Sequence, residues 1–227
     1  MFIMLDGIDG SGKSVQTKLL INRLKKAGKK VAMISFPQYG SASAAPIEQY
    51  LNGVYGSAQD VGPYRASILY AIDRYAAAPR IRAWLKAGKI VVANRYVASN
   101  MGHQGGKIAN AKERKKFFVW NDNLEYNIFD IPRPDVNIIL HVRPDIAQKL
   151  VDQKGARAYL KGAKRDIHEA DIKHLAEAER TYLEIAKLFS GYQVVECVEK
   201  NEILPIKNIH EKIWKIVAHR LKLKKMI

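Results

Sequence analysis

Residues 2–14 read FIMLDGIDGSGKS, and this stretch decides the fold class. Residues 7–14 match the pattern G-x-x-x-x-G-K-[S/T] of a phosphate-binding loop, or P-loop. The apolar run before the motif is typical of a buried strand, and residues 13–27 carry the apolar spacing of a helix that ends at Gly28. A strand, a glycine-rich turn and a helix in this order form the context in which the motif binds a nucleoside triphosphate.

The same alternation of strands and helices continues along the chain. Apolar runs typical of buried strands recur at residues 31–36, 90–93, 136–142 and 192–195. Helical patterns fill residues 64–87, 169–189 and 206–223. We therefore expect one α/β domain over residues 1–227, with the three-layer α/β/α architecture of P-loop NTPases and a five-stranded parallel sheet flanked by helices. Ligands of such sheets bind beyond the carboxyl ends of the strands.

Each part of the P-loop has a physical reason. Glycines let the backbone curl so that its N–H groups point at phosphate oxygens, and the following helix offers its N-terminus to the same anion. Lys13 supplies a cation for the β- and γ-phosphates, and the hydroxyl of Ser14 suits Mg²⁺. The candidate ATP-binding residues are Gly7, Asp9, Gly10, Ser11, Gly12, Lys13, Ser14 and Val15.

Asp9 is unexpected inside a loop that binds phosphate, because a carboxylate there repels the ligand. We expect it to contact Mg²⁺, a water molecule or a sugar hydroxyl of a second substrate. A solvent-facing aspartate in a turn is the alternative. Ser14 and Asp9 are thus the candidate metal ligands.

The composition indicates which partners and which cellular location to expect. Lys and Arg number 38 against 22 Asp and Glu, so the formal net charge is +16. Such a charge suits nucleic acid, but many of the lysines stand at helix ends, where they complement the helix dipole, so we do not expect a nucleic-acid partner. The single cysteine, Cys197, predicts a reducing, cytoplasmic location. We expect neither a signal peptide nor a membrane span, because the N-terminal apolar run is short and no other run is long enough.

Three further segments accompany the P-loop. They are FPQYG at residues 36–40, an aromatic-x-x-x-Arg helix segment at 70–74, and NRYVASN at 94–100. With the aspartate inside the P-loop, this ordered set resembles the thymidylate kinase family, from residue 2 to about residue 190. The resemblance implies transfer of a phosphoryl group from ATP to dTMP with Mg²⁺, giving ADP and dTDP in dTTP biosynthesis, and a homodimer.

The resemblance also implies roles for single residues. Tyr70 stacks on thymine, Arg74 donates to a base carbonyl, and Asn100 meets the base edge. Arg95 holds the acceptor phosphate, since a planar guanidinium suits phosphate well. Asp9 meets the 3′-hydroxyl or the metal. The acceptor-binding residues implied in this way are Asp9, Phe36, Pro37, Tyr39, Tyr70, Arg74, Arg95, Ser99, Asn100, His103 and Gln104.

Plainer interpretations exist for several of these residues. Tyr70 and Tyr75 lie on an amphipathic stretch, and we expect Tyr75 to be core. Arg74 could be half of a surface ion pair, for example with Asp73. Asn100 could cap a helix, a frequent role of asparagine.

Residues 153–169 resemble the lid of a nucleoside monophosphate kinase. Basic and small residues alternate there, and mobile cations stabilise the charge that spreads over a transferring phosphoryl group. Gly10 stands where some family members carry a basic residue, so the chain resembles the type in which a lid arginine supplies the cation. Arg157 and Arg165 are the candidates, although a solvated basic loop would look similar. The expected catalytic residues are Lys13, Arg95, Asp9, Arg157 and Arg165.

Two positions depart from the family pattern. Asn94 replaces an aspartate before the arginine, which weakens Mg²⁺ binding unless Asp6 or Asp9 substitutes. Gln38 stands where the family often has arginine. The alternatives therefore remain a kinase for another pyrimidine nucleoside monophosphate, and a non-catalytic nucleotide- or nucleic-acid-binding P-loop protein. A deoxynucleoside kinase would need an acid after the second strand, where this chain has Phe36 and Pro37.

Overall fold

The computed structural model describes residues 1–152 and 172–222. Five strands form one parallel sheet in the order β2-β3-β1-β4-β5. Their bounds are Phe2–Asp6 (β1), Val31–Ser35 (β2), Ile90–Asn94 (β3), Val136–His141 (β4) and Tyr192–Glu196 (β5). All five expected strands are present, each within one residue of its predicted ends. The predicted fold class is confirmed.

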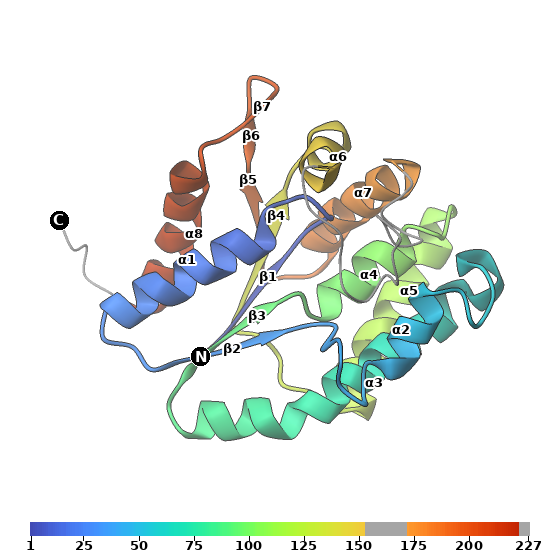
Figure 1. Ribbon diagram of the computed structural model, residues 1–227, viewed down its shortest axis with the longest axis horizontal. Coiled ribbons are helices and arrows are strands. Elements are labelled where there is room, and N and C mark those ends of the chain that lie inside the picture. The colour runs from blue at the N-terminus through green and yellow to red at the C-terminus, as the bar shows by residue number, and fades with distance from the viewer. Residues whose placement is uncertain (153–171, 223–227) are drawn as a thin grey trace.

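Helices cover both faces of the sheet (Figure 1). On one face α1 (Lys13–Lys26) packs beside α8 (Ile206–Arg220). On the other face lie α3 (Ala58–Lys86), α4 (Val97–Gly105), α5 (Ala111–Asn123) and α7 (Ile172–Leu188). The central strand β1 is buried along its whole length, as the continuous apolar run predicted.

Several elements escaped the sequence prediction because they are short or lack a clear apolar period. They are α2 (Ala45–Leu51), α4, α5, the single π-helical turn η1 (Leu124–Ile128) and the hairpin of β6 (Val198–Glu199) and β7 (Glu202–Ile203). Local capping explains where some begin. The side chain of Asn110 accepts hydrogen bonds from the first turn of α5, and Ser57 and Asp60 form a capping box at α3.

Close packing fixes α4 against its neighbours. A Cβ atom on Gly102 would lie 2.6 Å from the ring of Tyr182 in α7, and one on Gly105 would lie 2.7 Å from Phe118 in α5. Glycine is therefore needed at both positions, because any side chain would push the helices apart. The helix α4, which carries residues 97–100 of the NRYVASN segment, is thus packed closely against α5 and α7.

The register places the carboxyl ends of three strands at one edge of the sheet. Ser35 of β2 lies beside Asn94 of β3, which lies beside Leu5 of β1. The helix α6 (Pro144–Asp152) follows β4 at the same edge. No helix within residues 1–152 and 172–222 combines the length and apolar character needed to cross a membrane.

Candidate nucleotide-binding site

A cavity of about 830 Å³ opens along the carboxyl ends of β1, β2 and β3. Except for Gly7 and the lid arginines, it is lined by every residue that the sequence proposed for the site. These lining residues are Asp9, Gly10, Ser11, Gly12, Lys13, Ser14, Val15, Phe36, Pro37, Tyr39, Tyr70, Arg74, Arg95, Ser99, Asn100, His103 and Gln104. The structure thus brings together segments that lie up to 95 residues apart in the chain, from Asp9 to Gln104.

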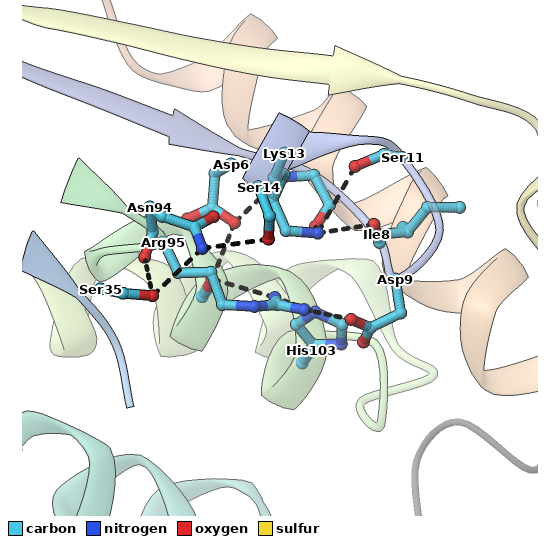
Figure 2. A network of polar contacts seen from close by, with 12 residues as sticks. Asp6, Ile8, Asp9, Ser11, Lys13, Ser14, Ser35, Asn94, Arg95 and His103 are labelled. Carbon is cyan, nitrogen blue, oxygen red and sulfur yellow. Dashed lines mark hydrogen bonds and ion pairs between the residues drawn. The ribbon is translucent and has the colours of Figure 1, made fainter. Parts of the chain in front are cut away.

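The P-loop is curled around the ammonium group of Lys13. Its Nζ donates hydrogen bonds to the backbone oxygens of Gly7 and Ile8, at 2.9 and 2.7 Å (Figure 2). Gly10 and Gly12 adopt φ angles of 85° and 83°, which other residues rarely adopt. The cation therefore lies inside the loop, where it can exchange carbonyl oxygens for phosphate oxygens.

Asp6 is a buried hub beneath the P-loop. Its Oδ1 accepts hydrogen bonds from the Gly7 backbone N–H at 2.9 Å and from the hydroxyls of Ser99 and Tyr182, both at 2.7 Å. Its Oδ2 accepts from the Tyr96 backbone N–H at 3.1 Å. Burial, and then the negative charge of Asp6, raise the pKa of Tyr182 well above its usual range, so its hydroxyl stays a donor. Asp6 is committed to these donors, and the suggestion that it substitutes as a metal ligand is not supported.

Asp9 and Arg95 form an ion pair across the cavity (Figure 2). Arg95 follows β3 with a φ of 67°, which turns its side chain toward the P-loop. Its Nη1 lies 3.3 Å from Ser99 Oγ and 3.0 Å from His103 Nε2. Burial alone would lower the pKa of Arg95, but the Asp9 carboxylate raises it, so Arg95 remains charged. The site thus holds a fixed cation that is balanced by the aspartate inside the P-loop.

Asn94 lies between two hydroxyl groups. Its Nδ2 donates to Ser35 Oγ at 3.1 Å and lies 3.5 Å from Ser14 Oγ. Its Oδ1 is buried and has no hydrogen-bond partner among the described residues. The Asn94 side chain thus reaches the Ser14 hydroxyl, and a neutral amide there fits the surroundings of a hydrated Mg²⁺ ion, which keeps several waters and takes few protein ligands. Within residues 1–152 and 172–222, no group of three or more His, Cys, Asp or Glu side chains could hold a metal.

The far end of the cavity is polar but buried. Tyr70 lines it and meets the ring of Tyr50 edge-on, with 6.3 Å between the ring centres. Arg74 is only 2% exposed and forms a two-pronged ion pair with Glu125, so it is not part of a surface pair. Asn100 lies inside α4 and does not cap it. Both plainer interpretations of Arg74 and Asn100 are therefore wrong.

Gln38 has a structural place next to the cavity. Its backbone N–H and its Nε2 donate to the two carboxylate oxygens of Asp73, at 2.8 and 2.9 Å, and its Oε1 accepts from Arg80. The glutamine thus ties the FPQYG segment to α3. Tyr75 is 55% exposed, so its expected place in the core is wrong.

The cavity extends past the P-loop to a part that the sequence did not indicate. Leu204, Pro205, Ile206 and Ile209 line it there, and the side chain of Gln16 donates to the backbone oxygen of Ile206 at 3.0 Å. The apolar run at residues 203–206, just before a helix, was the available signal. An apolar wall at the base of the P-loop suits the flat face of an adenine ring. The lid candidates Arg157 and Arg165 lie outside the described residues.

A P-loop after the central strand of a parallel sheet, continuous with a polar cavity at the strand ends, defines a nucleotide-binding protein of the P-loop class. The site has an apolar and a polar end on either side of the phosphate loop, as two nucleotides require.

The chain belongs to the thymidylate kinase family, because a model of that family matches residues 5–213. A thymidylate kinase of Mycobacterium tuberculosis is 29% identical over 187 residues, which cover 82% of this chain and 86% of that protein. A probable thymidylate kinase of Pyrobaculum aerophilum is 33% identical over 155 residues, covering 68% and 71%. The solved structure of thymidylate kinase from Candida albicans shares the fold, with a TM-score of 0.72 and 20% identity over 97% of this chain and 92% of that chain. The class of enzyme is therefore an ATP-dependent nucleoside monophosphate kinase, a phosphotransferase.

Proposed function

We propose that this protein transfers the γ-phosphoryl group of ATP to dTMP, giving ADP and dTDP. The observation that carries the proposal is the continuous cavity from the apolar wall at Ile206, past Lys13, to Tyr70 and Arg74. ATP would lie with its adenine at the apolar end and its phosphates on the P-loop. dTMP would place its base at Tyr70 and its phosphate at Arg95.

The proposed reaction needs no general base. An anionic oxygen of the dTMP phosphate attacks the γ-phosphorus, the bond to the β–γ bridging oxygen breaks, and its electron pair leaves with ADP. Lys13 neutralises the charge that develops on the β- and γ-phosphates, and alignment supplies much of the remaining rate.

The Asp9–Arg95 pair gives the acceptor phosphate a place to bind. The incoming phosphate competes with Asp9 for the Arg95 guanidinium, since both anions suit the same fork of donors. The freed carboxylate then accepts a hydrogen bond from the 3′-hydroxyl. In this scheme Asp9 keeps Arg95 in place before the substrate arrives.

Mg²⁺ is the proposed cofactor. It would be held by the hydroxyl of Ser14, with Asp9 and the Oδ1 of Asn94 nearby to bind it or its waters. When bound, the ion neutralises charge between the β- and γ-phosphates. Arg157 or Arg165 of the lid, residues 153–169, would add the remaining cation.

We further propose a homodimer built on α3. Its exposed side carries Tyr64, Ile68, Ile72 and Tyr75, spaced so that they share one helix face. Two further exposed apolar residues are Val119 on α5 and Ile128 on η1. The turn η1 contacts both α3 and α5. An apolar stripe of this kind on a charged protein suits a second copy of the same surface.

The chain would act as a single kinase domain in the cytoplasm, which its one buried cysteine, Cys197, also suits. A kinase for a different pyrimidine monophosphate remains the second candidate, because Asn94, which lines the cavity, departs from the family pattern.

The test is a coupled ADP-release assay with ATP, Mg²⁺ and a panel of dTMP, dUMP, dCMP, UMP, CMP, AMP and GMP. We expect dTMP to be preferred. Lys13→Ala should lower the turnover about 100-fold or more, a far larger effect than its effect on the melting temperature. Preference for another monophosphate would still agree with a nucleoside monophosphate kinase, but its acceptor would then not be dTMP. An absence of turnover with every acceptor, despite ATP binding, would contradict the kinase proposal.

A further inference from the structure

Glu125 is a buried carboxylate in the π-helical turn η1. It is 0% exposed and accepts hydrogen bonds from three side chains. Arg74 donates to it through Nε and through Nη2, the latter at 2.7 Å. Asn100 and Asn121 donate to its Oε1 at 3.1 and 3.3 Å. Two of these donors, Arg74 and Asn100, line the cavity, whereas Glu125 itself does not.

Glu125 fixes the orientation of the Asn100 side chain. The Asn100 Nδ2 group donates one hydrogen bond to Glu125 and another to the backbone oxygen of Ser67, at 3.0 Å. Both partners accept only, so the amide cannot be turned around without placing its oxygen against two other oxygens. The Asn100 Oδ1 is consequently the free end, and it is buried without a hydrogen-bond partner in the described part of the chain.

Glu125 likewise determines how Arg74 meets the cavity. Nε and Nη2 of Arg74 are engaged by the carboxylate, so Nη1 is the donor left for a ligand. The ionised carboxylate also keeps Arg74 charged. Burial alone would lower the pKa of this arginine, but the negative charge of Glu125 raises it. Two residues that line the polar end of the cavity thus carry groups of fixed orientation, a donor on Arg74 and an acceptor on Asn100.

We propose that Glu125 is the positioning residue that sets base specificity, by holding Asn100 as an acceptor and Arg74 as a donor toward the base. This inference rests on the proposed function, since it deepens the account of the same acceptor site. Thymine and uracil carry an N3–H beside a carbonyl, which matches an acceptor beside a donor. Cytosine has a lone pair at N3, which would face the Asn100 oxygen and leave it unpaired.

The variants Glu125→Gln and Glu125→Asp test the proposal. Glutamine can donate a hydrogen bond, so it relaxes the constraint on the Asn100 amide. We expect Glu125→Gln to lower the ratio of kcat/KM for dTMP to that for dCMP by about tenfold or more, mainly through KM for dTMP. Aspartate accepts only, so Glu125→Asp should keep the ratio even where KM rises. Asn121→Ala is the matched control, because it removes a donor to the same carboxylate away from the cavity and should leave the ratio unchanged.

A second measurement uses the wild-type protein, in case Glu125→Gln does not fold. Binding of dTMP is compared by calorimetry with binding of N3-methyl-dTMP, which cannot donate from N3, and we expect the methylated nucleotide to bind at least tenfold more weakly. Equal binding of the two nucleotides, or an unchanged dTMP-to-dCMP ratio in a folded Glu125→Gln variant, would overturn the inference. Failure of the wild type to turn over any monophosphate would instead contradict the proposed function.

Discussion

Asn94 is the position where one atom separates this chain from the family pattern. Its Nδ2 faces the Ser14 and Ser35 hydroxyls and its Oδ1 is buried, and an aspartate at this position would bring a full negative charge. We expect Asn94→Asp to lower the Mg²⁺ concentration at half-maximal rate by about three- to tenfold, because a carboxylate attracts the ion or its waters more strongly than an amide. The measurement is a Mg²⁺ titration of the steady-state rate at saturating ATP and dTMP.

The control for this prediction is Ser35→Ala. It removes the stronger hydrogen bond of Asn94 without adding charge, so the Mg²⁺ midpoint should stay within about twofold. An unchanged midpoint in Asn94→Asp would mean that this position does not reach the metal or its waters.

The residues of the site divide into those that could be predicted and those that could not. Asp9, Lys13 and Arg95 stand within motifs whose spacing along the chain is itself the signal. Glu125 gives no such signal, because its partner Arg74 lies 51 residues earlier and the residues around it form a single π turn. A glutamate between Leu124 and Tyr126 was the available hint, since a charge among apolar residues needs a buried partner.

At the scale of elements, His141 joins α7 to the edge of the sheet. Its Nδ1 lies 2.5 Å from Glu196 Oε2 on β5, and its Nε2 lies 2.8 Å from Glu179 Oε1 on α7. Burial alone would lower the pKa of His141, but hydrogen bonds to Glu196 and Glu179 outweigh burial and raise it above 6.5. A protonated imidazole that donates to two carboxylates thus stabilises the folded chain.

The pH dependence follows from the direction of this shift. A pKa that is higher in the folded chain gives full stabilisation below pH 6.5, the ordinary value, which is lost as the pH rises through the folded value. In the wild type we expect the free energy of unfolding to fall by roughly 1 kcal/mol between pH 6 and 9. This fall should be absent from the His141→Gln variant. Urea unfolding at several pH values measures it. His219→Gln, an exposed histidine on α8, should keep the wild-type slope.

Elements were predictable where their pattern is local. The five strands are short apolar runs, of which β1 and β3 are almost wholly buried, and α1 and α8 carry helical spacing, so each was expected. The helix α4 is short, contains glycines at contact positions and is buried on nearly all sides, and α5 has little amphipathic pattern. Contacts between distant segments, not local propensity, form these elements.

At the scale of the whole molecule, the stripe on α3 makes an assembly prediction. Ile72 is 39% exposed near the middle of that stripe. In a twofold dimer it would occur twice in the interface, so Ile72→Asp would bury two unpaired carboxylates. We expect the dissociation constant to rise by about 100-fold or more, as measured by sedimentation velocity over a range of protein concentrations.

Leu188→Asp on α7 serves as the matched control. Leu188 is 44% exposed but lies outside the stripe, so its substitution should leave the dimer intact. The proposed interface would be contradicted if the wild-type protein stayed monomeric at high concentration. It would also be contradicted if the Ile72→Asp variant associated as tightly as the wild type.

Gly10 limits how this enzyme could evolve. The backbone of α6 presses against it, so a Cβ atom on this residue would lie 2.8 and 2.9 Å from the carbonyl carbon and Cα of Ala147, and its φ is 85°. Replacing a side chain at position 147 would not open space, because the obstacle is main chain. An arginine at position 10 would therefore be destabilising unless the backbone of α6 had first moved away. A single codon change is therefore not enough to place a cation in this loop of the present chain, because the position of α6 would also have to change.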